Sequence, residues 1–207
     1  MAKPDKSIDP RILDCAKQEF LDKGFEKASL QTICNHAGVT TGALYKRYKG
    51  KEELFCAVVE PTIEAIYEML QNRSIEHLQK LSDTELINCW RMQEENVMFY
   101  FQFFYQHKDG FVLLLKDSAG TKHENFAHEF VSRLSDNTIR YYQEGYRRGI
   151  FLREISEEEF HILLSAFWTA IYEPFIHNME WDKMREHTRL ICKYFNWLSV
   201  LEVEEEV

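Results

Sequence analysis

The sequence of 207 residues has little proline and glycine, with only 4 and 8 of them. Because these residues interrupt helices and build tight turns, so few of them favour a helical fold over one of many short strands. No run of about 18 apolar residues is present, so the sequence predicts no membrane-spanning helix. The first residues, MAKPDKS, contain no apolar signal segment, and we therefore expect a cytoplasmic location.

The five cysteines follow neither a disulfide nor a zinc-binding spacing, because they are scattered, odd in number and form no C-x-x-C pair. The sequence also lacks a P-loop, a dinucleotide fingerprint and a G-x-S-x-G motif. His123 and His128 resemble the H-E-x-x-H pair of zinc proteases only superficially, since they are five residues apart instead of four. We therefore expect a protein that is not an enzyme, with no catalytic residue, metal site or cofactor.

Charge is divided unevenly along the chain. The net charge is −9, yet residues 1–51 hold ten Lys and Arg against six Asp and Glu, which gives this segment +4 and the rest −13. A basic segment attached to an acidic remainder is typical of a protein that contacts DNA phosphates through one part alone. Hydrophobic residues make up 45% of the chain, enough for a folded core.

The basic segment predicts three short helices. Asp9 is suited to cap the first helix, and Gly24 is suited to end it. Ser29 can cap a second helix, Gly38 allows the left-handed turn after it, and Thr40 can cap a third. Two short helices joined by a glycine turn, the second with small and hydroxyl residues at its start, form a helix-turn-helix that presents this second helix to the DNA major groove.

The remaining sequence predicts longer helices and no alternating strand pattern. We expect an all-α protein of about nine helices, divided into residues 1–52 and 53–207. The helices expected after the basic segment cover residues 51–71, 83–105, 111–117, 123–148, 157–178 and 181–201.

Four segments together carry a family resemblance: ILDCAKQEFLDKGF at 12–25, AGV at 37–39, GALY at 42–45 and KEEL at 51–54. Their order and spacing resemble the DNA-binding head of TetR-family transcriptional regulators. The resemblance implies that residues 1–52 form a helix-turn-helix DNA-binding domain. It also implies that residues 53–207 form a helical domain for ligand binding and dimerisation.

The expected DNA contacts lie on the second and third helices and just after them. Short side chains at the start of the third helix allow close approach to base edges, and a glutamine can bridge adenine N6 and N7. The resemblance implies that Tyr45 contacts a phosphate or base and that Lys46 lies over the groove. The full expected set is Ser29, Gln31, Thr40, Thr41, Gly42, Ala43, Tyr45, Lys46, Tyr48, Lys49 and Lys51. As alternatives, Tyr48 packs against the first helix, and Arg47 pairs with an acidic residue of the second domain.

Aromatic residues concentrate in the second domain, where they predict either an ordinary core or the walls of a ligand pocket. Acidic residues among them could meet a cationic ligand. The candidate ligand-binding residues are Trp90, Glu94, Phe101, Tyr142, Tyr146, Trp168 and Tyr172.

The last two expected helices carry broad apolar faces that a homodimer would cover as a four-helix bundle. We therefore expect a repressor that binds double-stranded DNA at a palindromic operator and is released by a small-molecule inducer. The alternatives are a metal-responsive regulator of the same fold, a redox-responsive one, or a helical enzyme or adaptor. A metal-responsive regulator would use scattered His and Cys residues, such as His123, His128 or His161.

Overall fold

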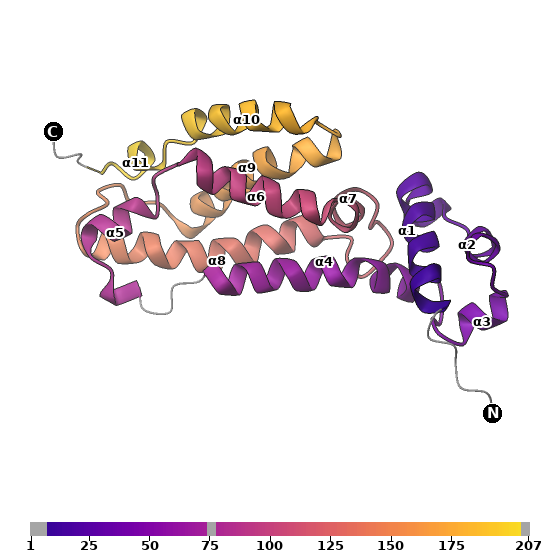
Figure 1. Ribbon diagram of the computed structural model, residues 1–207. Helices are drawn as coiled ribbons and strands as arrows, with labels where there is room; N and C mark the ends of the chain where they lie inside the picture. Colours follow the sequence, from indigo (N-terminus) through magenta and orange to yellow (C-terminus); the bar gives the residue numbers. More distant parts are fainter. Residues whose placement is uncertain (1–7, 74–77, 204–207) are drawn as a thin grey trace. The chain divides into compact units, whose positions relative to one another are not determined.

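The computed structural model describes residues 8–73 and 78–203, which form eleven α-helices, one 3-10 helix and no β-strand (Figure 1). The all-helical fold predicted from the sequence is confirmed. Two compact units share these residues: unit 1 holds residues 8–69 and 107–127, and unit 2 holds the others. Within the described ranges, no helix is both long and apolar enough to cross a membrane.

Unit 1 is built from α1 (Ile8–Lys27), α2 (Leu30–Ala37), α3 (Thr41–Tyr45), the greater part of α4 (Lys51–Arg73) and α7 (Lys108–Lys116). Its centre contains fully buried side chains from different helices, among them Ile12, Phe20, Ile33, Leu44 and Phe55. The rings of Phe20 and Phe55 meet edge to face with centroids 5.1 Å apart, so α1 and α4 share one aromatic core.

Most of the predicted helix boundaries in unit 1 are confirmed. The Ser29 hydroxyl accepts a hydrogen bond from the Thr32 N–H at 3.3 Å, and the Thr40 hydroxyl accepts one from the Ala43 N–H at 3.2 Å. Gly38 ends α2 in the left-handed conformation, with φ 64°. The expected cap at Asp9 is wrong, because α1 already begins at Ile8.

Unit 2 contains the 3-10 helix η1 (Leu78–Lys80), α5 (Asp83–Asn88), α6 (Glu94–Gln106), most of α8 (Phe126–Arg147), α9 (Glu157–Ile176), α10 (Trp181–Tyr194) and α11 (Trp197–Val200). Its aromatic side chains form much of its core. Trp90 meets Phe151, Phe160 and Trp197, each with ring centroids 5.7–5.9 Å away. These residues come from four segments, so their packing holds distant parts of the sequence together.

Two expected helices are each divided in two, which accounts for eleven helices instead of about nine. Residues 83–105 form α5 and α6, because the chain leaves the helix after Asn88 and buries Trp90 among aromatic rings. Residues 181–201 form α10 and α11, because the Asn196 side chain accepts a hydrogen bond from the Ser199 N–H at 3.3 Å and begins a new helix.

The division into units 1 and 2 follows packing and does not coincide with the boundary expected at residue 52. α4 continues through that position without interruption, and α7 packs with α1 in unit 1. Residues 107–127 therefore belong to the same compact unit as the first three helices. The division of functions at residue 52 stays a prediction.

The close approach of α7 to α4 depends on Gly110. A Cβ atom at this position would lie 2.0 Å from the Thr62 hydroxyl oxygen, and Thr62 is itself buried. We predict that Gly110→Ala lowers the free energy of unfolding by about 1–3 kcal/mol, the usual range for overpacking a core. Urea denaturation measures this loss.

The matched control for this prediction is the double variant Gly110→Ala/Thr62→Ala. Removing the Thr62 hydroxyl and methyl groups makes room for the new Cβ, so the double variant should recover part of the lost stability. If the losses in free energy of unfolding of the two single variants simply add in the double variant, the contact between Gly110 and Thr62 does not cause the destabilisation.

Candidate nucleic-acid interface

The surface of α2 and α3 presents the polar side chains expected at the DNA. In α3, Leu44 is fully buried, whereas Thr40, Thr41, Gly42, Tyr45 and Lys46 are exposed. Leu44 thus packs into the core, while the first residues of α3 face solvent. Tyr45 is 56% exposed although it is a large aromatic residue, which leaves its ring and hydroxyl accessible to a partner.

Side-chain hydrogen bonds fix the two helices of this surface. The Ser29 N–H donates to Glu19 Oε1 of α1 at 3.0 Å, which positions the start of α2. Gln31 is exposed, and its amide Nε2 donates to Asn35 Oδ1 one turn later at 3.0 Å. This bond holds the Gln31 side chain on the solvent-exposed face of α2.

Arg47 has a structural partner that the sequence analysis did not find. Its guanidinium pairs with the carboxylate of Asp9 and also donates to the Ala43 carbonyl at 3.1 Å. The pair with Asp9 lies within unit 1, and the alternative that Arg47 also meets an acidic residue of the second domain stays a prediction. The pair connects the first turn of α1 to the end of α3, 38 residues later in the sequence, and so helps to hold α3 in place.

Tyr48 and Lys49 follow α3 directly. Tyr48 is half-buried, and burial together with the negative charge of Asp9 raises the pKa of its hydroxyl. The Tyr48 hydroxyl therefore stays protonated at neutral pH and can donate to a phosphate oxygen. The Lys49 side chain is exposed, while its N–H donates to Glu53 Oε2 at 2.6 Å in the first turn of α4.

Lys51 is held by the protein itself. Its ammonium donates to the carbonyls of Glu26 at 2.8 Å and Ala28 at 3.2 Å, and it lies 4.8 Å from the Phe25 ring centroid. Two of its three N–H donors are thus used at the end of α1, with a cation–π contact in addition. This arrangement assigns Lys51 a positioning role at the junction of α1, α2 and α4.

The candidate ligand-binding residues are distributed over several parts of unit 2. Phe101 and Trp168 are buried core residues, and Glu94 is exposed and pairs with Arg189 of α10 at 3.4 Å. The Tyr172 hydroxyl lies 3.1 Å from Thr169 Oγ1, and Tyr146 is 41% exposed and stacks on Tyr142.

Tyr142 and Trp90 differ in whether their polar groups have hydrogen-bond partners. The Tyr142 hydroxyl donates to the Arg153 carbonyl at 2.9 Å and accepts from the Ile155 N–H at 2.7 Å, so it fixes the loop before α9. The buried Trp90 Nε1–H has no hydrogen-bond partner within the described residues. A buried donor without a partner costs about 1–3 kcal/mol of stability. An acceptor for the Trp90 Nε1–H would remove this cost.

The described residues offer little support for a metal or thiol sensor. No three His, Cys, Asp or Glu side chains come together in residues 8–73 and 78–203 as a set of metal ligands. Burial raises the pKa of the Cys34, Cys56 and Cys192 thiols, which lowers the fraction of reactive thiolate.

Comparison with known proteins matches this surface to a protein family. The family described as "Bacterial regulatory proteins, tetR family" matches residues 12–58, which run from α1 through the start of α4. The HTH-type transcriptional regulator UidR of Escherichia coli (strain K12) is 37% identical over 49 residues, which cover 24% of this chain and 25% of UidR. Over residues 12–58, the chain is therefore similar to the TetR family.

Similarity to TetR-family proteins extends along most of the chain at lower identity. An HTH-type transcriptional regulator of Staphylococcus aureus (strain USA300) is 23% identical over 186 residues, which cover 77% of this chain and all of that protein. The structure of SmeT in complex with triclosan covers 97% of this chain and 94% of its own, with a TM-score of 0.62 and 19% identity. At this identity, the structural match supports the TetR-family fold. Because UidR is matched over only a quarter of its length, its activity is not transferred.

The contacts of Lys51 and Lys49 predict different consequences for stability. We expect Lys51→Ala to lower the melting temperature of the protein, because the carbonyls of Glu26 and Ala28 lose their donor. Lys49→Ala removes an exposed side chain and should leave the melting temperature nearly unchanged. Circular dichroism melting of both variants measures the difference, and equal melting temperatures would contradict the positioning role of Lys51.

Proposed function

We propose that this protein is a repressor that binds a palindromic operator as a homodimer and releases it when a small-molecule inducer binds. The exposed start of α3 is the observation that carries this proposal. Capped by Thr40 and anchored by Leu44, it offers hydroxyl and small side chains to a DNA groove. The TetR-family match over residues 12–58 supports the same function.

The proposed DNA contacts fall into two groups. Thr41 and Gln31 contact base edges, and the exposed start of α3 brings Gly42 and Ala43 close to the bases. Tyr45, Lys46, Tyr48 and Lys49 contact phosphates on either side of the groove. Lys51, Ser29 and Thr40 act mainly by positioning, since their polar groups already bond within unit 1.

Dimerisation is proposed through α9 and α10. A surface groove of about 930 Å³ runs between these helices and is lined mostly by apolar side chains, including Pro174, Leu190 and Ile191. Leu190 is 63% exposed and Tyr194 82%, so large apolar groups face solvent in a single chain. A second copy related by twofold symmetry would cover them and place two α3 helices on two operator half-sites.

The inducer is proposed to bind within the aromatic part of unit 2. The unpaired Trp90 Nε1–H supports a ligand that carries a hydrogen-bond acceptor beside apolar groups. By linkage, an inducer that favours a conformation unable to bind the operator must itself bind less tightly in the presence of operator DNA, by the same factor.

The two groups of DNA contacts predict different effects on sequence preference. Thr41→Ala and Gln31→Ala should each relax the preference at one position per half-site, with a cost of about 1–3 kcal/mol on the preferred operator. Lys46→Ala should weaken binding to all sequences alike and reduce the slope of log K against log salt by about 1. Selection of bound duplexes from a random pool, followed by salt titration, measures both effects. Equal losses on operator and random DNA for all three variants would overturn the division.

If a second copy covers the groove between α9 and α10, one charge placed in the groove should disrupt the dimer. We expect Leu190→Glu to convert the protein from dimer to monomer at micromolar concentration, because it places a charge in the covered groove. Leu152→Glu is the matched control, since Leu152 is 52% exposed and lies outside the groove. Sedimentation velocity distinguishes the species. A wild-type monomer, or a monomer produced equally by both variants, would contradict the proposed interface.

A further inference from the structure

A second cavity lies at the end of α8, away from the groove between α9 and α10. Arg140, Gln143, Glu144 and Arg147 follow the spacing i, i+3, i+4 and i+7, so they share one face of α8. Across from this face lie residues 78–80 of η1, and together they enclose a surface cavity of about 480 Å³.

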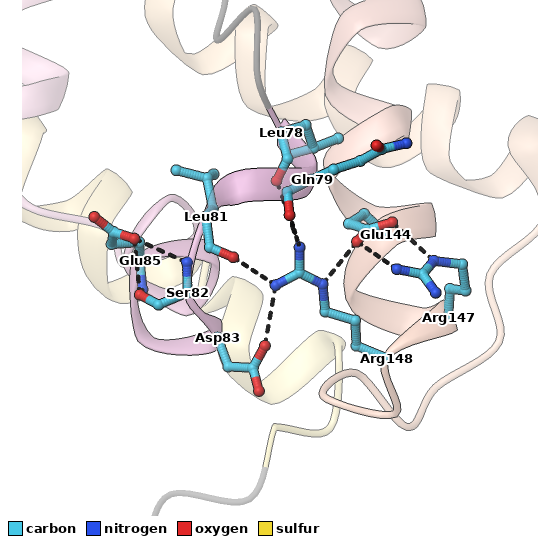
Figure 2. Close-up of polar contacts among 9 residues, drawn as sticks. All are labelled: Leu78, Gln79, Leu81, Ser82, Asp83, Glu85, Glu144, Arg147 and Arg148. Atoms are coloured by element: carbon cyan, nitrogen blue, oxygen red, sulfur yellow. Dashed lines mark hydrogen bonds and ion pairs between the residues drawn. The ribbon is translucent and has the colours of Figure 1, made fainter.

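Arg148 makes the wall of this cavity rigid (Figure 2). Its guanidinium donates to the carbonyls of Leu81 at 2.6 Å, Gln79 at 3.2 Å and Leu78 at 3.5 Å. It also donates to Asp83 Oδ1 at 3.1 Å and Glu144 Oε1 at 2.7 Å. These five bonds use all five N–H donors of the guanidinium, so Arg148 holds η1 against α8 and has none left for a ligand.

Arg147 is fixed on the cavity side by the same carboxylate. Its Nε donates to Glu144 at 2.9 Å and its Nη2 at 2.7 Å, in a bidentate arrangement (Figure 2). Hydrogen bonds from Arg147 and Arg148 lower the pKa of Glu144 from the usual 4.5 to about 2, so it is a carboxylate at neutral pH. The Arg147 side chain remains 69% exposed, and its Nη1 has no protein partner within the described residues.

The cavity carries a surplus of positive charge. Besides Arg147, it is lined by Lys80 and Arg140, which are exposed and form no ion pair or hydrogen bond within the described part of the chain. Three cations therefore face one carboxylate, that of Glu144. Unit 2 as a whole is acidic, with 12 Lys and Arg against 20 Asp and Glu. The cavity is therefore positively charged within a unit whose net charge is negative.

We propose that this cavity binds a small organic dianion, a dicarboxylate or a phosphate ester, through Arg140, Arg147 and Lys80. The surplus of two positive charges matches a ligand with two negative charges, and the volume limits the ligand to a small molecule. Arg147 presents N–H donors in an orientation already fixed by Glu144, and Lys80 and Arg140 supply charge from the two opposite walls. A bound dianion connects η1 to α8.

Titration calorimetry with the full-length protein tests the proposal, with succinate and inorganic phosphate as probes at constant ionic strength set by NaCl. We expect saturable binding of at least one probe, and the tighter probe identifies the ligand as carboxylate or phosphate. Arg140→Gln and Lys80→Gln should each weaken binding about tenfold, the effect of losing one charged hydrogen bond. Because both side chains are exposed and have no partner among residues 8–73 and 78–203, neither substitution should lower the melting temperature.

Arg185→Gln on α10 is the matched control, since it removes an equally exposed positive charge outside the cavity. It should bind the probes as the wild type does. Absence of saturable binding of both probes at millimolar concentration would overturn the proposal. Equal weakening by Arg185→Gln would also overturn it, because the effect would then depend only on net charge.

Discussion

The aromatic contact between α1 and α4 is the interaction on which the DNA-binding surface depends. Phe20 and Phe25 of α1 meet Phe55 of α4 edge to face, with centroids 5.1 and 5.4 Å apart. α3 has only five residues, too few for a helix that is stable by itself. It persists because Leu44 is fully buried in unit 1 and because Arg47 joins its end to Asp9. The exposed groups of α3 can therefore vary without loss of the fold.

Sequence reasoning succeeded where the signal is local. A hydroxyl residue before a helix and a glycine after it act within one turn, and for this reason Ser29, Gly38 and Thr40 could be assigned correctly. It failed where the cause is distant. No proline or glycine marks the break after Asn88, since the burial of Trp90 against rings from residues 151–197 produces it. The cap at Asn196 was a local signal that could have been recognised.

The candidate sites show the same limit. Leu44 faces the core, so helical periodicity places the start of α3 on the solvent side. The residues at the start of α3 could therefore be named from the sequence. Lys51 was expected at a phosphate because it is basic and near the third helix, and that contact stays a prediction. The sequence did not reveal that carbonyls 23 and 25 residues earlier hold its ammonium. The aromatic pattern of unit 2 could not separate core from ligand contacts, since Phe101 and Trp168 are buried in ordinary packing. Arg140 and Lys80 lack any sequence motif, because only the fold brings η1 to α8.

Helices form two of the three connections between the two units. Between the described ranges of the two units, the chain passes after residues 69, 106 and 127. Two of these passages lie inside uninterrupted helices, α4 and α8, and a helix transmits a displacement along its axis better than a loop does. α7 packs with α1, and its Gly110 leaves no space against Thr62 of α4. A shift of α4 thus cannot be absorbed at this contact and must move α7 as well. Because close-packed contacts switch between discrete arrangements instead of deforming continuously, α1, α4 and α7 behave as one packed group within unit 1.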